Sequence, residues 1–106
     1  MHQEIYVVGS LPRSSLAACA EFVANHLPIV QEKLDAEKCD SLAIVLPSGS
    51  VDEDDWRRAL ALDLAREYRP KRVNVLGSAD LAAAKDGLAY LRNAQGVTGQ
   101  YLQSHE

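Results

Sequence analysis

The chain of 106 residues lacks the features that mark several classes of protein. It has only two cysteines, Cys19 and Cys39, and its three histidines are far apart, so neither a disulfide framework nor a metal site is expected. The formal net charge of −4 argues against a nucleic-acid-binding surface, which is normally basic. No apolar run approaches the roughly 20 residues that cross a bilayer, so no membrane partner is expected either.

The first residues, MHQE, also lack the basic start and apolar run of a secretion signal, and we predict a cytoplasmic protein. At this length the chain is expected to form a single domain around one hydrophobic core. Cys19 lies among apolar helical positions and is interpreted as a small core residue. Cys39 stands at a helix-to-strand junction, where a reactive thiol is the alternative to a structural one.

Short apolar runs alternate with longer amphipathic segments along the chain, and this alternation predicts an α/β domain. The predicted strands are 4–9, 41–47, 72–76 and 97–103, and the predicted helices are 14–36, 52–68 and 79–93. Strands that alternate with helices in the order βαβαβαβ form a parallel sheet with right-handed crossovers. We therefore expect a four-stranded, three-layer domain with a buried first strand and a polar last strand at an edge.

The predicted helix 14–36 has an apolar stripe that continues across Pro28, so one kinked helix is favoured over two separate helices. The residues of this stripe are Leu16, Ala20, Val23, Leu27, Val30 and Leu34. Ser14 is the expected N-cap. Phe22 and Ile29 lie off the stripe and are expected to contact a second partner, either the sheet or another subunit.

Acidic residues gather at the start of the predicted helix 52–68. Ser50 and Glu53 match the spacing of a capping box, and the carboxylates at 52–55 suit the positive end of the helix dipole. A cation site is the alternative for these carboxylates, but no glycine-interrupted calcium loop follows them. Helix capping is therefore the favoured interpretation.

Three segments in the second half of the chain resemble one enzyme family. They are ALALDLA at 59–65, RVN at 72–74 and VTGQYL at 97–102. They are similar to the last third of the short-chain dehydrogenase/reductase family, in which a helix ending in ALA-x-ELA precedes an RVN strand and a TGQ-x-L strand. The resemblance implies a half-Rossmann fold, the C-terminal four strands of a seven-stranded Rossmann domain. The strands that carry most of the family's dinucleotide site would then be absent.

The resemblance carries over few catalytic residues. The family's tyrosine would fall near Leu46 and its lysine near Ser50, and neither residue type is present, so the Tyr-x-x-x-Lys pair is not found. Ser48 lies close to the position of the catalytic serine and Asn25 matches the active-site asparagine, and these two are the only catalytic candidates. A serine without the tyrosine acid and the lysine cannot run the family's hydride chemistry. NAD or NADP is implied by the resemblance alone, and no cofactor is expected.

Candidates for ligand contact lie in the turns after the predicted strands, where parallel sheets bind ligands. They are Gly9, Ser10, Arg13, Ser14, Gly77 and Ser78. Gly9 could begin a glycine-rich nucleotide loop, but no further glycine follows it and an ordinary turn is favoured. Arg13 beside Ser14 at a helix start is a hypothesis for phosphate binding. The turn Gly77-Ser78 lacks the proline that contacts the nicotinamide in the family.

The missing strands would leave residues 5–8 as an apolar edge that needs a cover. The helices 14–36 and 52–68 correspond to those that build a four-helix bundle between subunits in the family. Trp56 and Tyr68 recur on one helix face and are interpreted as core or interface anchors. We therefore predict a homodimer or a complex with another protein, through the edge or through the helices. The candidate interface residues are Tyr6, Val8, Phe22, Ile29, Trp56 and Tyr68.

The sequence thus predicts a non-catalytic Rossmann module, similar to short-chain dehydrogenases, that acts through protein–protein contacts. The alternative is an NAD(P)-dependent oxidoreductase or nucleotide-binding subunit whose site is completed by another chain.

Overall fold

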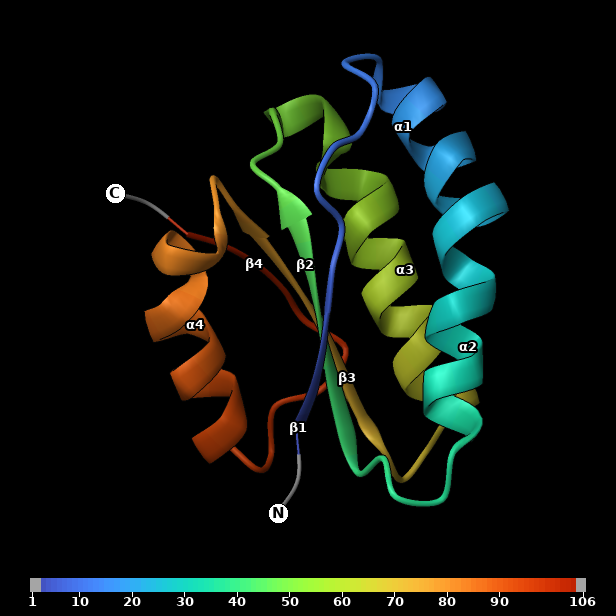
Figure 1. The fold of residues 1–106 in the computed structure, drawn as a ribbon, viewed down its shortest axis with the longest axis vertical. Coiled ribbons are helices and arrows are strands. Elements are labelled where there is room, and N and C mark those ends of the chain that lie inside the picture. Colours follow the sequence, from blue (N-terminus) through green and yellow to red (C-terminus); the bar gives the residue numbers. More distant parts are fainter. Residues whose placement is uncertain (1–2, 105–106) are drawn as a thin grey trace.

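The structure is a computed structural model that describes residues 3–104, and its strands form one parallel sheet (Figure 1). The strands are β1 (Gln3–Val7), β2 (Ser41–Pro47), β3 (Arg72–Ser78) and β4 (Tyr101–Gln103), in the order β1-β2-β3-β4. The helical segments are α1 (Ser15–Glu21), η1 (Phe22–His26), α2 (Leu27–Asp35), η2 (Val51–Glu53), α3 (Asp54–Glu67) and α4 (Leu81–Asn93). The predicted βαβαβαβ order and the three-layer, four-stranded parallel sheet are confirmed.

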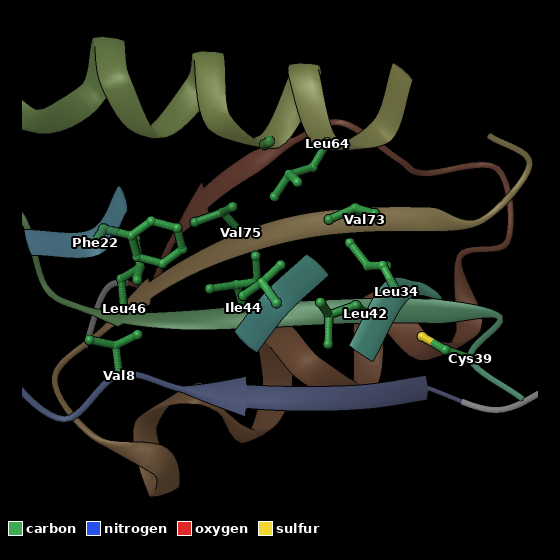
Figure 2. Packing of buried hydrophobic residues seen from close by; sticks show 12 residues of the cluster. Val8, Phe22, Leu34, Cys39, Leu42, Ile44, Leu46, Leu64, Val73 and Val75 are labelled. Atoms are coloured by element: carbon green, nitrogen blue, oxygen red, sulfur yellow. The ribbon is translucent and has the colours of Figure 1, made fainter. Parts of the chain in front are cut away.

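The central strand β2 divides the core into two clusters because alternate side chains point to opposite faces of a sheet. Leu42, Ile44 and Leu46 point to one face, where they pack against the helices (Figure 2). Ala43 and Val45 point to the other face, under α4. The first cluster also contains Val8, Phe22, Val30, Leu34, Cys39, Ala61, Leu64, Val73 and Val75. The chain thus buries apolar side chains on both sides of a single sheet.

The crossovers do not all have the same hand. α1, α2 and α3 lie on one face of the sheet, whereas α4 lies on the other, where it covers Ala43, Val45 and Leu76 (Figure 1). Because the strands step in one direction from β1 to β4, a crossover through the opposite face must have the opposite hand. The first two crossovers are right-handed and the third, through α4, is left-handed. The prediction of uniformly right-handed crossovers is wrong for α4, because the second face also needs a cover.

The segments α1, η1 and α2 form one continuous helix with a π-helical turn, η1, at its centre. The N–H of Leu27 donates to the carbonyl of Phe22, five residues earlier. Pro28 follows and has no N–H to contribute to the α-helical pattern. The Ser14 hydroxyl accepts the N–H of Ala17 at 3.3 Å. The predicted single helix with an interruption near Pro28 is confirmed, and so is its N-cap.

The π turn changes which residues face the sheet. It holds more residues than an α-helical turn, so the helix rotates less per residue there and the buried stripe shifts between α1 and α2. Phe22 is 0% exposed, whereas Leu16 and Val23 are 82% and 51% exposed. The predicted stripe is therefore wrong in α1. It is right in α2, where Val30 and Leu34 are buried.

The capping box predicted before α3 does not form. Ser50 precedes η2, a short 3-10 turn, and its side chain makes no capping hydrogen bond. The Glu53 carboxylate instead accepts from Arg57, one helical turn later, at 3.3 Å. Asp54 and Asp55 do occupy the first turn of α3, where the helix dipole favours negative charge.

The two strands in the second half of the chain have other bounds than predicted. β3 extends through Gly77 and Ser78, predicted as a turn, because both pair in register with the end of β2. β4 is shorter than predicted because the Asn74 side chain holds the segment before it. The Nδ2 of Asn74 donates to the carbonyl of Val97 at 3.0 Å, and its Oδ1 accepts from the N–H of Gln100 at 3.1 Å.

β1 and β4 form the two edges of the sheet. The edge position of the last strand is confirmed, but the prediction of a buried strand at 4–9 is wrong. Ile5 and Val7 are 42% and 46% exposed, because β1 has a neighbour on one side only and α4 packs mainly on β3 and β2.

Replacement of two neighbouring residues tests the position of the buried stripe. Phe22→Ala should lower the free energy of unfolding by about 3–5 kcal/mol, because it leaves a cavity in the core. Val23→Ala, at an exposed position, should change it by about 0.5 kcal/mol or less. Urea unfolding followed by circular dichroism measures both values. A larger loss for Val23→Ala than for Phe22→Ala would contradict the π turn.

Candidate functional site

A buried arginine lies beyond the carboxyl ends of the strands, where parallel α/β folds bind ligands. Arg57 projects from α3, and its side chain is 1% exposed. Its Nη1 donates to the carbonyl of Pro47, at the end of β2, at 2.8 Å. The same atom donates to the hydroxyl of Tyr101, in β4, at 3.2 Å. One side chain thus connects α3, β2 and β4.

The charge of Arg57 is compensated inside the fold. The carboxylate of Glu53, which is also buried, accepts from its Nη2 at 3.3 Å. The guanidinium lies 5.4 Å from the ring centroid of Trp56 and 5.7 Å from that of Tyr101, within cation–π range. Removal of either charged partner would leave the other buried without compensation.

A chain of hydrogen bonds fills the space next to Arg57. The Tyr101 hydroxyl donates to Oε1 of Gln103, and Nε2 of Gln103 donates to the carbonyl of Gly49 at 2.8 Å. A Cβ at Gly49 would lie 2.9 Å from Cζ of Arg57, and a Cβ at Gly77 would lie 2.8 Å from the Tyr101 hydroxyl. A side chain at either position would therefore have to displace the ends of the Arg57, Tyr101 or Gln103 side chains. The end of β3 is covered by the protein's own side chains.

Three of the predicted ligand-binding residues have structural roles. Ser14 is the N-cap of α1. Ser78 is buried, and its hydroxyl donates to the carbonyl of Asp80 at 3.0 Å. Gly77 lies beneath the Tyr101 hydroxyl. The structure therefore does not bring these three residues together around an open site.

The other site candidates do not all converge on one cavity. Arg13 and Ser48 line one cavity of about 220 Å³. Gly9 lines a different cavity of about 230 Å³, and Ser10 is exposed in the loop that follows. Asn25 is exposed on η1, where its Nδ2 donates at 2.9 Å to a carboxylate of its own helix. The two catalytic candidates, Ser48 and Asn25, therefore do not share a cavity.

The candidate interface residues differ in their accessibility. Val8 and Phe22 are buried in the core of the chain itself, so neither is available to a partner. Ile29 is exposed on α2. Three candidates are half-buried and pack with one side against the core; they are Tyr6, Trp56 and Tyr68.

The sequence interpretation missed Arg57 as a buried residue. Arg57 and Arg58 are adjacent and resemble an ordinary exposed basic pair. The available signal is spacing, because Arg57 precedes Ala61 by four residues and Leu64 by seven, which places all three on one helix face. Ala61 and Leu64 are both buried in the core.

Within residues 3–104, no group of three histidine, cysteine, aspartate or glutamate side chains could hold a metal ion. Over the same range, no helix has the length and apolar character needed to cross a membrane.

Comparison with protein families identifies a match. The model of the SDR-like family, described as short chain dehydrogenase-like protein, matches residues 6–104. The chain belongs to this family. The resemblance seen in three segments of the sequence is confirmed and extends over nearly the whole chain. No curated protein and no solved structure matches the chain.

In this SDR-like chain, the sequence resemblance puts the family's tyrosine and lysine near Leu46 and Ser50. Leu46 is fully buried and packs in the core below the helices (Figure 2). Ser50 is exposed before η2. Neither side chain can act as the acid or the cation that the family's hydride chemistry requires.

Cys39 is a core residue rather than a reactive thiol. It is buried, and its Sγ donates to the carbonyl of Ser41 at 3.6 Å. Burial raises the pKa of the Cys39 thiol above its ordinary value of 9.0, and the ammonium of Lys71 offsets only part of this effect. A thiol that stays protonated is a poor nucleophile.

Loss of the buried charge should destabilise the fold. Arg57→Met should lower the free energy of unfolding by about 3–5 kcal/mol, because Glu53 is left buried without its partner. Arg58→Met is the matched control on the exposed neighbour and should cost about 0.5 kcal/mol or less. Urea unfolding followed by circular dichroism gives both values. The double variant Glu53→Gln/Arg57→Met should be more stable than Arg57→Met alone, and equal losses in the two single variants would contradict this account.

The raised pKa of Cys39 predicts a loss of stability at alkaline pH. Below pH 9.0 the thiol is protonated in both the folded and the unfolded chain, so it adds no pH dependence. Above that value the unfolded thiol ionises first, and the free energy of unfolding falls by at most about 1.4 kcal/mol per pH unit until the folded thiol ionises. Cys39→Ala should remove this part of the slope in urea titrations above pH 9. Identical slopes for Cys39→Ala and the wild type would refute the assignment.

Proposed function

We propose that this SDR-like chain is a non-catalytic Rossmann module that acts through protein–protein contacts, by self-association or by binding a partner enzyme. The uncovered edge of the sheet carries this proposal. β1 pairs with β2 on one side only, and its side chains Ile5 and Val7 are largely exposed. An edge strand with apolar side chains and unpaired backbone groups favours pairing with another chain.

β1 has few features that would discourage such pairing. Edge strands are usually protected by prolines, by lysines, by bulges or by a covering element. Within β1, Glu4 is the one charged residue and there is no proline. The strand also pairs with β2 over all five of its residues without a bulge. Its regular geometry supports the addition of a further strand.

An apolar groove of about 550 Å³ lies beside this edge, between β1 and α4. Its apolar lining consists of Ile5, Leu81, Ala82, Leu88 and Ala89. Contiguous apolar surface of this kind marks an interaction site more often than chance exposure does. The groove therefore supports the edge as the contact surface in preference to the helices α1 to α3.

The ends of the strands support the non-catalytic part of the proposal. The resemblance puts the family's acid and cation near Leu46 and Ser50, and neither residue is of the required type. Arg57 and Tyr101 cover the end of β3. General acid catalysis requires a titratable group within hydrogen-bond reach of the substrate, and the side chains of Leu46 and Ser50 supply none.

Sedimentation velocity at low micromolar concentration tests the contact surface. The wild type should sediment as a dimer, and Ile5→Lys should sediment as a monomer, because a lysine at the edge opposes strand pairing. Leu16→Lys, at an exposed position on α1, is the matched control and should leave the dimer intact. Dissociation by Leu16→Lys but not by Ile5→Lys would place the contact on the helices instead.

A monomeric wild type would contradict self-association and restrict the proposal to a partner enzyme. Titration of NADH and NADPH fluorescence tests the non-catalytic assignment. No change in fluorescence is expected from the chain alone or with a candidate partner. Saturable binding would contradict the assignment and favour a nucleotide-binding subunit completed by another chain.

A further inference from the structure

The edge strand β1 directs the backbone groups of alternate residues away from the sheet. In a parallel pair, the N–H and C=O of one strand residue bond the neighbouring strand, and those of the next residue point to the other side. The N–H of Val8 donates to the carbonyl of Val45 in β2 at 2.8 Å. The even-numbered residues of β1 are therefore the ones that bond β2. The outward-facing residues are Gln3, Ile5 and Val7.

The outward backbone groups of β1 are free for a further strand. Within residues 3–104, no turn or loop donates a backbone hydrogen bond to them or accepts one from them. In Figure 1, β1 runs in front of the other strands, with α4 on one side and α1 and α2 on the other. A strand that approaches this edge therefore meets unpaired N–H and C=O groups directly.

Side-chain bonds on both faces hold β1 in place. On one face, the Tyr6 hydroxyl is hydrogen-bonded to Nδ1 of His26 in η1 at 2.7 Å. On the other face, Nε2 of Gln3 donates to the carbonyl of Leu88 in α4 at 3.3 Å. A surface that is already ordered loses less conformational entropy when a partner binds. The edge is thus prepared for pairing before a partner arrives.

We infer that the partner at this edge is a second copy of the chain, whose β1 pairs antiparallel with the first across a two-fold axis at Ile5. The inference rests on the proposed function, because it requires the β1 edge to be the contact surface. Ile5 then lies opposite Ile5 of the other copy, and Gln3 lies opposite Val7 of the other copy. These are hydrogen-bonded pairs, in which the two residues exchange both N–H···O bonds. Every outward backbone group of β1 gains a partner in this arrangement.

The charge on β1 selects this register among the neighbouring ones. An axis at Glu4 would place this carboxylate opposite its own copy, and like charges directly opposite each other are destabilising. An axis at Tyr6 would place Gln3 opposite Gly9, which lies beyond the end of β1. The axis at Ile5 places Glu4 opposite Tyr6 of the other copy and brings two β-branched side chains together, which is a favourable cross-strand pair.

The other edge of the sheet is a poorer partner for β1. β4 has three residues, against five in β1, and so offers less backbone for pairing. Pairing of β1 with β4 of another copy would also leave an unpaired edge at each end of the assembly, so that copies would add without closure. The contact between two β1 strands uses the same surface in both copies and closes as a dimer.

Cysteine cross-linking tests the pairing and its register. The background is Cys19→Ala, which removes the half-buried thiol, while Cys39 is buried and is kept. Ile5→Cys places two thiols on opposed residues whose Cα atoms are about 5.5 Å apart, within the range of a disulfide. Glu4→Cys is the matched control, because its two thiols are on diagonal residues about 7–8 Å apart. Oxidation with copper phenanthroline at low micromolar protein should cross-link Ile5→Cys at least about tenfold faster than Glu4→Cys, measured by non-reducing electrophoresis.

A mixing experiment tests the same register at a second pair. In the same background, Gln3→Cys and Val7→Cys should each cross-link slowly alone, because neither residue lies opposite itself. An equimolar mixture of the two variants should cross-link rapidly, since Gln3 of one copy lies opposite Val7 of the other. An axis at Glu4 or at Tyr6 pairs neither residue with the other, so a mixture no faster than the single variants would overturn the register.

Hydrogen exchange followed by nuclear magnetic resonance gives a readout that needs no cysteine. The amide of Val7 points to the outer edge, so it should exchange at least about tenfold more slowly in the wild-type dimer than in monomeric Ile5→Lys. The amide of Tyr6 bonds β2 in both proteins and should be protected in both. Equal exchange of the Val7 amide in the dimer and the monomer would contradict pairing at this edge.

The outcomes separate this inference from the proposed function. A dimeric wild type in which Ile5→Cys cross-links no faster than Glu4→Cys would overturn the inference and leave self-association standing. Species larger than a dimer in sedimentation velocity would overturn it in favour of head-to-tail pairing of β1 with β4. A monomeric wild type would also overturn it, and the proposed function would then hold only for a partner enzyme.

Discussion

The carboxyl end of the sheet depends on the buried guanidinium of Arg57. β4 has only three residues, so it forms little backbone pairing of its own. The contacts of Arg57 with Tyr101 attach β4 to α3, and its bond to Pro47 attaches α3 to β2. A buried cation needs a buried anion, and Glu53 is used for this purpose instead of capping the helix. The contacts of Arg57 thus link the start of α3, the end of β2 and the position of β4.

The sequence predicts the order of elements because strands, helices and caps leave local signals. The apolar run of β2, the N-cap Ser14 and the position of Pro28 are each readable from a few neighbouring residues. The identity of the buried face of α1 depends on residues that are distant in the sequence. The π turn places Phe22 against the sheet and near Trp56, whose ring centroid lies 6.0 Å from that of Phe22. Helical periodicity alone assumes a uniform turn and therefore assigns Val23 to the core.

The candidate site could be predicted only in part, for the same reason. The comparison of Leu46 and Ser50 with the family's acid and cation needs only the sequence, because a residue type can be read without a structure. The hydrogen bond between Arg57 and Tyr101 could not be predicted from the sequence. These residues are 44 positions apart and come into contact only when β4 pairs with β3. A buried arginine is also rare, so its spacing on the helix face is a weak signal. The sequence also does not show on which face of the sheet α4 packs. An amphipathic pattern identifies the apolar side of a helix but not the face of the sheet that this side covers.

The left-handed crossover through α4 gives this sheet two unequal edges. The chain crosses to the other face of the sheet in α4, just before its last strand. After β4, Ser104 donates hydrogen bonds to the carbonyls of Gly77 and Ala83, which fix the end of this strand. β4 consequently offers three residues of backbone to any further strand, while β1 offers five beside an apolar groove. A further strand would therefore meet a longer stretch of edge backbone at β1 than at β4.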